Sequence, residues 1–96
     1  MFRHVVLFRI RDGVDATDIS AATRTLRSLG RHAGVVSWAV ERSLDERKGT
    51  IIAQDATFAD AAAFGEWRSS EAHREAANRM ARISDWWVAD WEQPAI

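Results

Sequence analysis

The sequence contains no cysteine, which excludes disulfide bonds, a thiolate nucleophile and cysteine-based zinc sites. It also contains no uninterrupted apolar run longer than that of residues 5–8, whereas a membrane span needs roughly 20 residues. No basic segment followed by an apolar stretch and a small-residue cleavage site opens the chain. We therefore expect a cytoplasmic protein without a membrane partner.

The chain has no large excess of basic or acidic residues, and it has few glycines. The 13 basic and 14 acidic residues give a formal net charge of −1, so no broad field attracts nucleic acid. The five glycines are isolated, so no glycine-rich loop is available to hold a phosphate. The three histidines lack the helical spacing of a zinc motif. We expect no metal, no cofactor and no nucleic-acid partner.

The composition that remains is typical of one globular domain covering residues 1–96. Apolar residues make up 47% of the chain and charged residues 28%, which argues against disorder. A chain of 96 residues is too short for two domains of ordinary size.

Side chains that alternate between the two faces predict four strands, at residues 3–10, 35–42, 50–58 and 86–92. After the first strand, apolar residues at spacings of three and four predict a helix that begins near Asp15 or Thr17 and stops at Gly30. After the third strand, Asp60 caps a second helix, which breaks and restarts near Glu71. The order β-α-β-β-α-(α)-β predicts an α+β fold, a ferredoxin-like antiparallel sheet with its helices on one face.

The expected sheet has more apolar surface than one layer of helices can cover. In the first strand, Val5 and Leu7 point to one face while His4 and Val6 point to the other, so both faces are apolar. Tryptophans on the second and fourth strands add to the excess: Trp38, Trp86, Trp87 and Trp91. Because the chain has no second layer of its own, we expect two copies to pack together as a homodimer.

Several short segments resemble those of one known family. They are residues 2–9, 34–37, 58–60, 71–73 and 90–92, and they occur in the family's order across nearly the whole chain. The sequence is thereby similar to the stress-responsive A/B barrel (Dabb) domains. The resemblance implies a dimeric α+β barrel, with a small pocket between each sheet and its helices.

One plant member of that family is a polyketide cyclase that closes a ring by aldol condensation. Its two working histidines fall on His4 and His73 of this sequence. Its catalytic tyrosine falls on Trp67 and a further pocket histidine on Ile52, neither of which can act as an acid or a base. The resemblance therefore implies a histidine pair without the rest of the cyclase machinery.

The residues themselves support a pocket at the histidine pair. His4 shares its strand face with Phe8, and His73 lies on the helical stripe that also carries Met80. Near the start of a helix the backbone dipole favours the neutral form of His73, which can serve as a base. We expect His4 and His73 as catalytic residues. The residues expected to contact the substrate are Phe8, Ile52, Trp67 and Met80. The alternatives are that His4 is a structural histidine at a strand end and that His73, at the start of a helix, points to solvent.

Three other polar residues are expected to have plain structural roles. Asp55 and Asp90 lie inside predicted strands, where a hydrogen bond or an ion pair to an arginine would satisfy them. His32 lies in the turn at residues 30–34, where we expect it to be exposed.

These observations leave several functions open. The first is a homodimer that binds a small apolar or aromatic molecule and acts as a cofactor-independent cyclase, lyase or isomerase, with His73 as general base and His4 orienting the substrate. The second is a non-enzymatic ligand-binding or stress-associated module. The third is a cofactor-free monooxygenase of the antibiotic-biosynthesis type. RNA binding is disfavoured, because the third strand lacks interleaved basic and aromatic residues.

Overall fold

The computed structural model describes residues 1–94. Four strands form one antiparallel sheet in the order β2-β3-β1-β4. The strands are β1 Phe2–Ile10, β2 Val35–Arg42, β3 Ile51–Phe58 and β4 Ser84–Glu92. The helices are α1 Ala16–Ser28, α2 Ala61–Arg68 and α3 Glu71–Ile83, and a short 3-10 helix, Leu29–Arg31, follows α1. The ferredoxin-like α+β fold expected from the sequence is confirmed.

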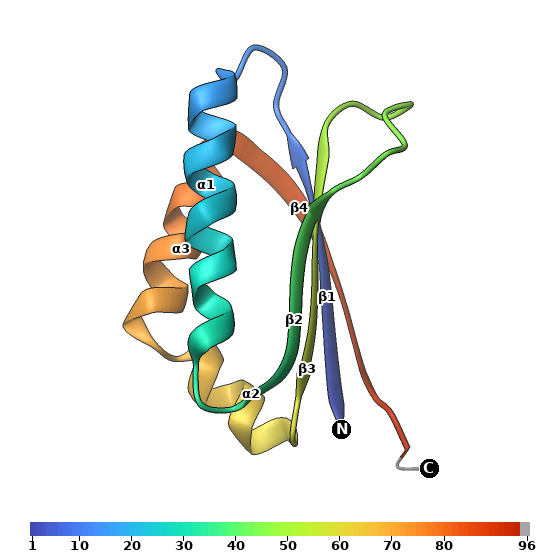
Figure 1. Cartoon of the computed structure of the whole chain (residues 1–96), viewed down its shortest axis with the longest axis vertical. Coiled ribbons are helices and arrows are strands. Elements are labelled where there is room, and N and C mark those ends of the chain that lie inside the picture. The colour runs from blue at the N-terminus through green and yellow to red at the C-terminus, as the bar shows by residue number, and fades with distance from the viewer. Residues whose placement is uncertain (95–96) are drawn as a thin grey trace.

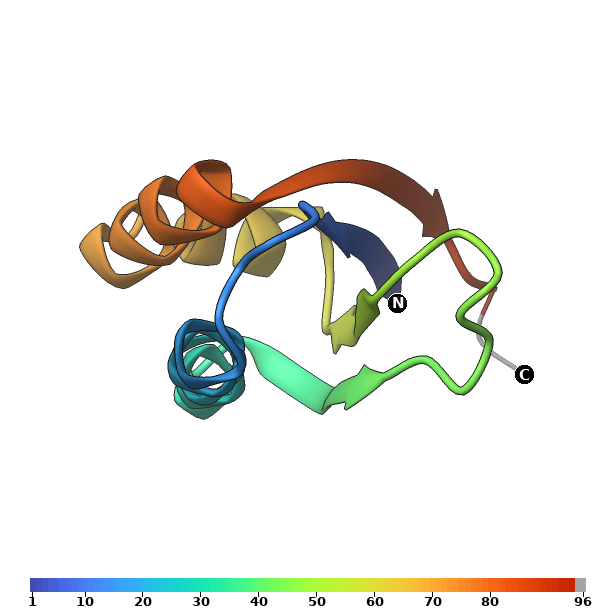
Figure 2. The ribbon, with the colours of Figure 1, turned by 90° about the horizontal axis from the view of Figure 1, so that it is seen from above.

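All three helices lie on one face of the sheet, and the other face carries no layer (Figure 1). Seen from above, α1 and α3 lie on the same side of the sheet (Figure 2). The core fills the space between the two layers, where apolar side chains from β1, β3 and the helices are removed from water. Its most deeply buried large side chains include Trp67, Phe58, Leu26 and Met80.

The alternation predicted for β1 is observed. The side chains buried on the helix side are those of His4, Val6, Phe8 and Ile10. On the other face, Leu7 is 44% exposed. The cap predicted for the helix after the third strand also forms. Asp60 accepts a hydrogen bond from the backbone N–H of Ala63 at 2.8 Å. The break before Glu71 occurs as expected, and there Ser70 caps α3.

The second strand differs from its expected pattern. Simple alternation along residues 35–42 would place Val36, Trp38 and Val40 on one face, but a bulge between Val35 and Ser37 shifts the register. Val35 therefore packs against the core, and Val36 is 52% exposed.

The tryptophans separate into two groups. Trp38 and Trp86 lie on the helix side, where Trp38 packs against Trp67 with ring centroids 5.7 Å apart. As expected, one helical layer does not cover all four tryptophans of these strands, although it covers Trp38, which shares its strand face with the buried Val40. On the uncovered face Trp87 and Trp91 remain, 64% and 44% exposed.

Candidate functional site

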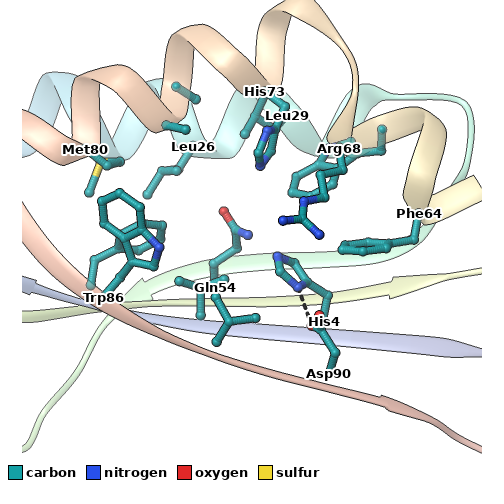
Figure 3. A pocket seen from close by; sticks show the side chains of 16 residues that line it. His4, Leu26, Leu29, Gln54, Phe64, Arg68, His73, Met80, Trp86 and Asp90 are labelled. Carbon is teal, nitrogen blue, oxygen red and sulfur yellow. Dashed lines mark hydrogen bonds and ion pairs between the residues drawn. The ribbon is translucent and has the colours of Figure 1, made fainter. Parts of the chain in front are cut away.

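A cavity of about 300 Å³ lies between the sheet and the helices α2 and α3 (Figure 3). This volume is at the lower end of the range of about 300–1,000 Å³ typical of small-molecule sites. Apolar and aromatic side chains make most of the wall, with a few polar groups among them. The polar lining residues are His4, Gln54, Arg68, His73 and Asp90. Such a wall suits a largely apolar ligand that has a few polar atoms.

His4 is fixed on the floor of the cavity by β4. The register places His4 opposite Asp90, and His4 Nδ1 lies 2.5 Å from Asp90 Oδ1. Above the imidazole, Phe64 and Trp67 pack with ring centroids at 4.9 and 5.4 Å. Because a carboxylate only accepts hydrogen bonds, Nδ1 carries the proton. In the neutral ring, the lone pair is therefore on Nε2.

His73 enters the cavity from the other layer. It is the third residue of α3, where its backbone N–H donates to Ser70 Oγ at 3.2 Å, and its ring stands edge-on to Trp67 at 4.5 Å. Burial lowers the pKa of His73, and the charges of His4 and Arg68 lower it further, although a backbone hydrogen bond with Arg68 acts in the opposite direction. His73 is therefore neutral near pH 7. That state was expected from the helix dipole, whereas burial is the leading cause.

Three polar wall residues were not recognised as site residues from the sequence, namely Gln54, Arg68 and Asp90. Gln54 points from β3 toward the helices, and Arg68 extends from the end of α2 toward His4 (Figure 3). A polar residue at an inward-facing position of a strand is unusual, so the alternation of the third strand could have identified Gln54 as a site residue. Nothing in the local sequence marks Arg68, because its direction depends on where α2 ends.

Most of the residues expected to contact substrate line the cavity. Phe8, Trp67 and Met80 belong to its wall. Ile52 does not line it and lies in the core, 2% exposed. Gln54, two residues further along the same strand face, lines the cavity instead. Two residues of strand span about 7 Å, which is enough to separate Ile52 from the cavity.

The remaining polar expectations had mixed outcomes. Asp55 forms the expected ion pair with an arginine, Arg3. Asp90 is paired as expected, but its partner is His4, because the register places the two residues opposite each other. His32 is half-buried instead of exposed, since its ring folds back to accept a hydrogen bond from the backbone N–H of Gly34 at 3.3 Å.

Two further classes of site, a metal centre and a membrane-spanning helix, are not found among the described residues. Among residues 1–94, no three histidine, aspartate or glutamate side chains are grouped closely enough to hold a metal ion. None of the helices in the same range has both the length and the apolar character needed to cross a membrane.

Solved structures with this fold have varied activities. A dimeric ferredoxin-like protein of unknown function from Thermobifida fusca is 20% identical, covers 96% of this chain and 90% of its own, and has a TM-score of 0.85. A hydroxynitrile lyase from Passiflora edulis is also 20% identical and has a TM-score of 0.82. Its match covers 94% of this chain and 90% of the lyase. A cofactor-independent oxygenase from Streptomyces nogalater, solved as a point mutant, is 18% identical and has a TM-score of 0.75. Its match covers 99% of this chain and 94% of the oxygenase. At these identities the likeness concerns the fold alone.

A search of curated protein sequences found no match. The family model described as the Stress responsive A/B Barrel Domain matches residues 2–93, which is nearly the whole chain. The resemblance seen in the sequence is thereby confirmed: the chain belongs to the stress-responsive A/B barrel domain family.

Proposed function

We propose that this protein is a homodimer that binds a small apolar or aromatic molecule and catalyses a cofactor-independent cyclisation, lyase or isomerisation reaction by proton transfer. The observation that carries the proposal is the pairing of His4 with Asp90 at 2.5 Å on the floor of an apolar cavity, below a neutral His73. A histidine held by a carboxylate in one tautomer is a recurrent general base.

The geometry favours exchanging the roles that the sequence suggested. Asp90 stabilises the positive charge that forms when His4 Nε2 accepts a proton. His73 has no carboxylate partner among residues 1–94, and its lowered pKa favours the neutral ring. We assign His4 as the base and His73 as a neutral hydrogen-bonding group that orients the substrate or stabilises a developing oxyanion. Phe8, Trp67 and Met80 would contact the apolar part of the substrate.

A chromogenic base-catalysed ring opening tests this proposal without knowledge of the natural substrate. In 5-nitrobenzisoxazole, a base removes the C–H proton while the N–O bond breaks, which gives a coloured cyanophenolate. We expect the protein to accelerate this reaction over buffer, and His4→Gln and Asp90→Asn to lower kcat/KM by about 100-fold, within the usual range for a general base. His32→Gln is the matched control, because His32 lies outside the cavity wall.

A non-enzymatic binding module is the second candidate. His4 is 6% exposed and packed against Phe64, which a structural histidine would also show. In that case 5-nitrobenzisoxazole would bind without accelerated ring opening, and His4→Gln would lower only the stability. Cofactor-free oxygenation rests on fold likeness alone, and oxygen uptake with a quinol substrate tests it.

The proposed dimer would form through the uncovered face of the sheet. Leu7 and Trp87 lie side by side there as a register pair of β1 and β4, and both are exposed in the single chain. Exposed apolar surface of this kind is typical of an interface. The protein from Thermobifida fusca with the same fold is dimeric, which supports the proposal of a dimer.

A further inference from the structure

We propose that the ligand of the cavity carries a carboxylate, and that Arg68 is the residue that selects it. The inference rests on the proposed function, because it takes the cavity to be a ligand site. It adds the chemical class of the ligand: a small apolar or aromatic carboxylic acid.

Arg68 is a cation without an anion. It is the last residue of α2, and it lines the cavity with its guanidinium extended toward His4 (Figure 3). Among residues 1–94 no carboxylate lies within ion-pair distance of it. Other arginines without such a partner lie outside the cavity, so Arg68 is the one arginine of the wall in the described part of the chain. A guanidinium is built to bind a carboxylate through two parallel hydrogen bonds.

The other charged or titratable groups of the wall leave that role to Arg68. His73 is neutral, so it offers no competing full charge. Asp90, the one carboxylate of the wall, is already engaged by His4. Asp90 would also repel a ligand carboxylate, which would orient the ligand with its acid group toward Arg68 and its apolar body toward Phe8 and Met80.

Gln54 gives independent evidence that the cavity is suited to a ligand with a polar group. Its side-chain Oε1 is buried without a hydrogen-bond partner among residues 1–94, and the whole residue is only 2% exposed. The amide points from the sheet into the cavity (Figure 3). An unsatisfied buried acceptor is unfavourable unless a ligand supplies a donor. A hydroxyl group on the ligand would be such a donor.

Calorimetric titration with phenylacetate and phenylacetamide tests the inference, since the two probes have nearly the same shape and differ in charge. We expect the wild-type protein to bind phenylacetate about tenfold more tightly than phenylacetamide. Arg68→Gln should remove this preference, and Arg68→Lys should retain part of it. Arg24→Gln is the matched control, because Arg24 is an exposed arginine of α1 outside the cavity wall.

The outcomes separate this inference from the proposed function. Equal binding of the two probes by the wild type, or an unchanged preference in Arg68→Gln, would overturn the inference and leave the proposed function standing. Binding of neither probe at millimolar concentration would overturn the inference, and absence of base catalysis with 5-nitrobenzisoxazole, which has no carboxylate, would independently count against the proposed function.

Discussion

At the scale of single residues, the two histidines show how neighbours assign different roles to one side-chain type. His4 has a carboxylate partner across a strand pair, whereas His73 has an aromatic wall and the charge of Arg68 nearby. The carboxylate holds the His4 ring in one tautomer, and burial beside positive charge favours the neutral ring of His73. Two groups whose environments differ in this way are a common arrangement for acid–base chemistry.

The lowered pKa of His73 predicts a dependence of stability on pH. Because its pKa in the folded protein lies below the ordinary value of 6.5, the unfolded chain binds more protons between the two values. This contribution to stability is present above about pH 6.5 and is lost as the pH falls toward the folded pKa. In urea unfolding at a fixed protein concentration, the free energy of unfolding should fall less on acidification in His73→Gln than in the wild type. An equal decrease in the free energy of unfolding in both proteins would contradict a lowered pKa of His73.

Gln54 predicts a conflict between stability and binding. Replacing it with methionine, which has a similar length, removes a buried acceptor that has no partner in residues 1–94. We expect Gln54→Met to raise the free energy of unfolding by about 1 kcal/mol and to weaken binding of hydroxylated ligands. Chemical denaturation measures the first effect and calorimetry the second. A lower free energy of unfolding would mean that the amide is satisfied in the folded protein.

At the scale of elements, the connection from α1 to β2 depends on a close approach of backbone and side chain. A Cβ atom added at Gly30 would lie 2.4 Å from two ring atoms of Trp38, and this ring is itself packed against Trp67. The interior has no room for the displacement that would follow.

We therefore expect Gly30→Ala to lower the free energy of unfolding by about 1–3 kcal/mol, as overpacking of a core does. Gly65→Ala is the matched control. Gly65 lies inside α2, nothing within 4 Å would meet its added Cβ, and alanine is the better helix former by about 0.5–1 kcal/mol. Thermal unfolding of the two variants should give shifts of opposite sign. A shift of the same sign would show that the 3-10 segment moves to relieve the contact.

At the scale of the whole molecule, the uncovered sheet face predicts dimerisation. Native mass spectrometry should give a mass near twice 10.8 kDa for the wild-type protein. Leu7→Arg should give a folded monomer, because Leu7 is exposed in the single chain and an arginine there would be buried without a partner in the dimer.

Leu44→Arg is the control for that experiment. Leu44 is a fully exposed leucine in the connection between β2 and β3, so the same change of residue there should leave the dimer intact. A monomeric wild-type protein would contradict the dimer outright. A dimeric Leu7→Arg protein would show that another surface makes the contact.

The sequence by itself determined the element order, the inward face of β1, the helix break before Glu71 and the family. These features follow from local rules, namely side-chain alternation, capping and motif spacing. The tertiary structure alone decided that Val36 turns outward, that Asp90 meets His4 and that Gln54 replaces Ile52 at the cavity. Each of these outcomes depends on strand register or on a bulge, and a shift of one residue moves a side chain to the opposite face. The cavity joins residues from both ends of the chain, so only the folded protein brings its chemistry together.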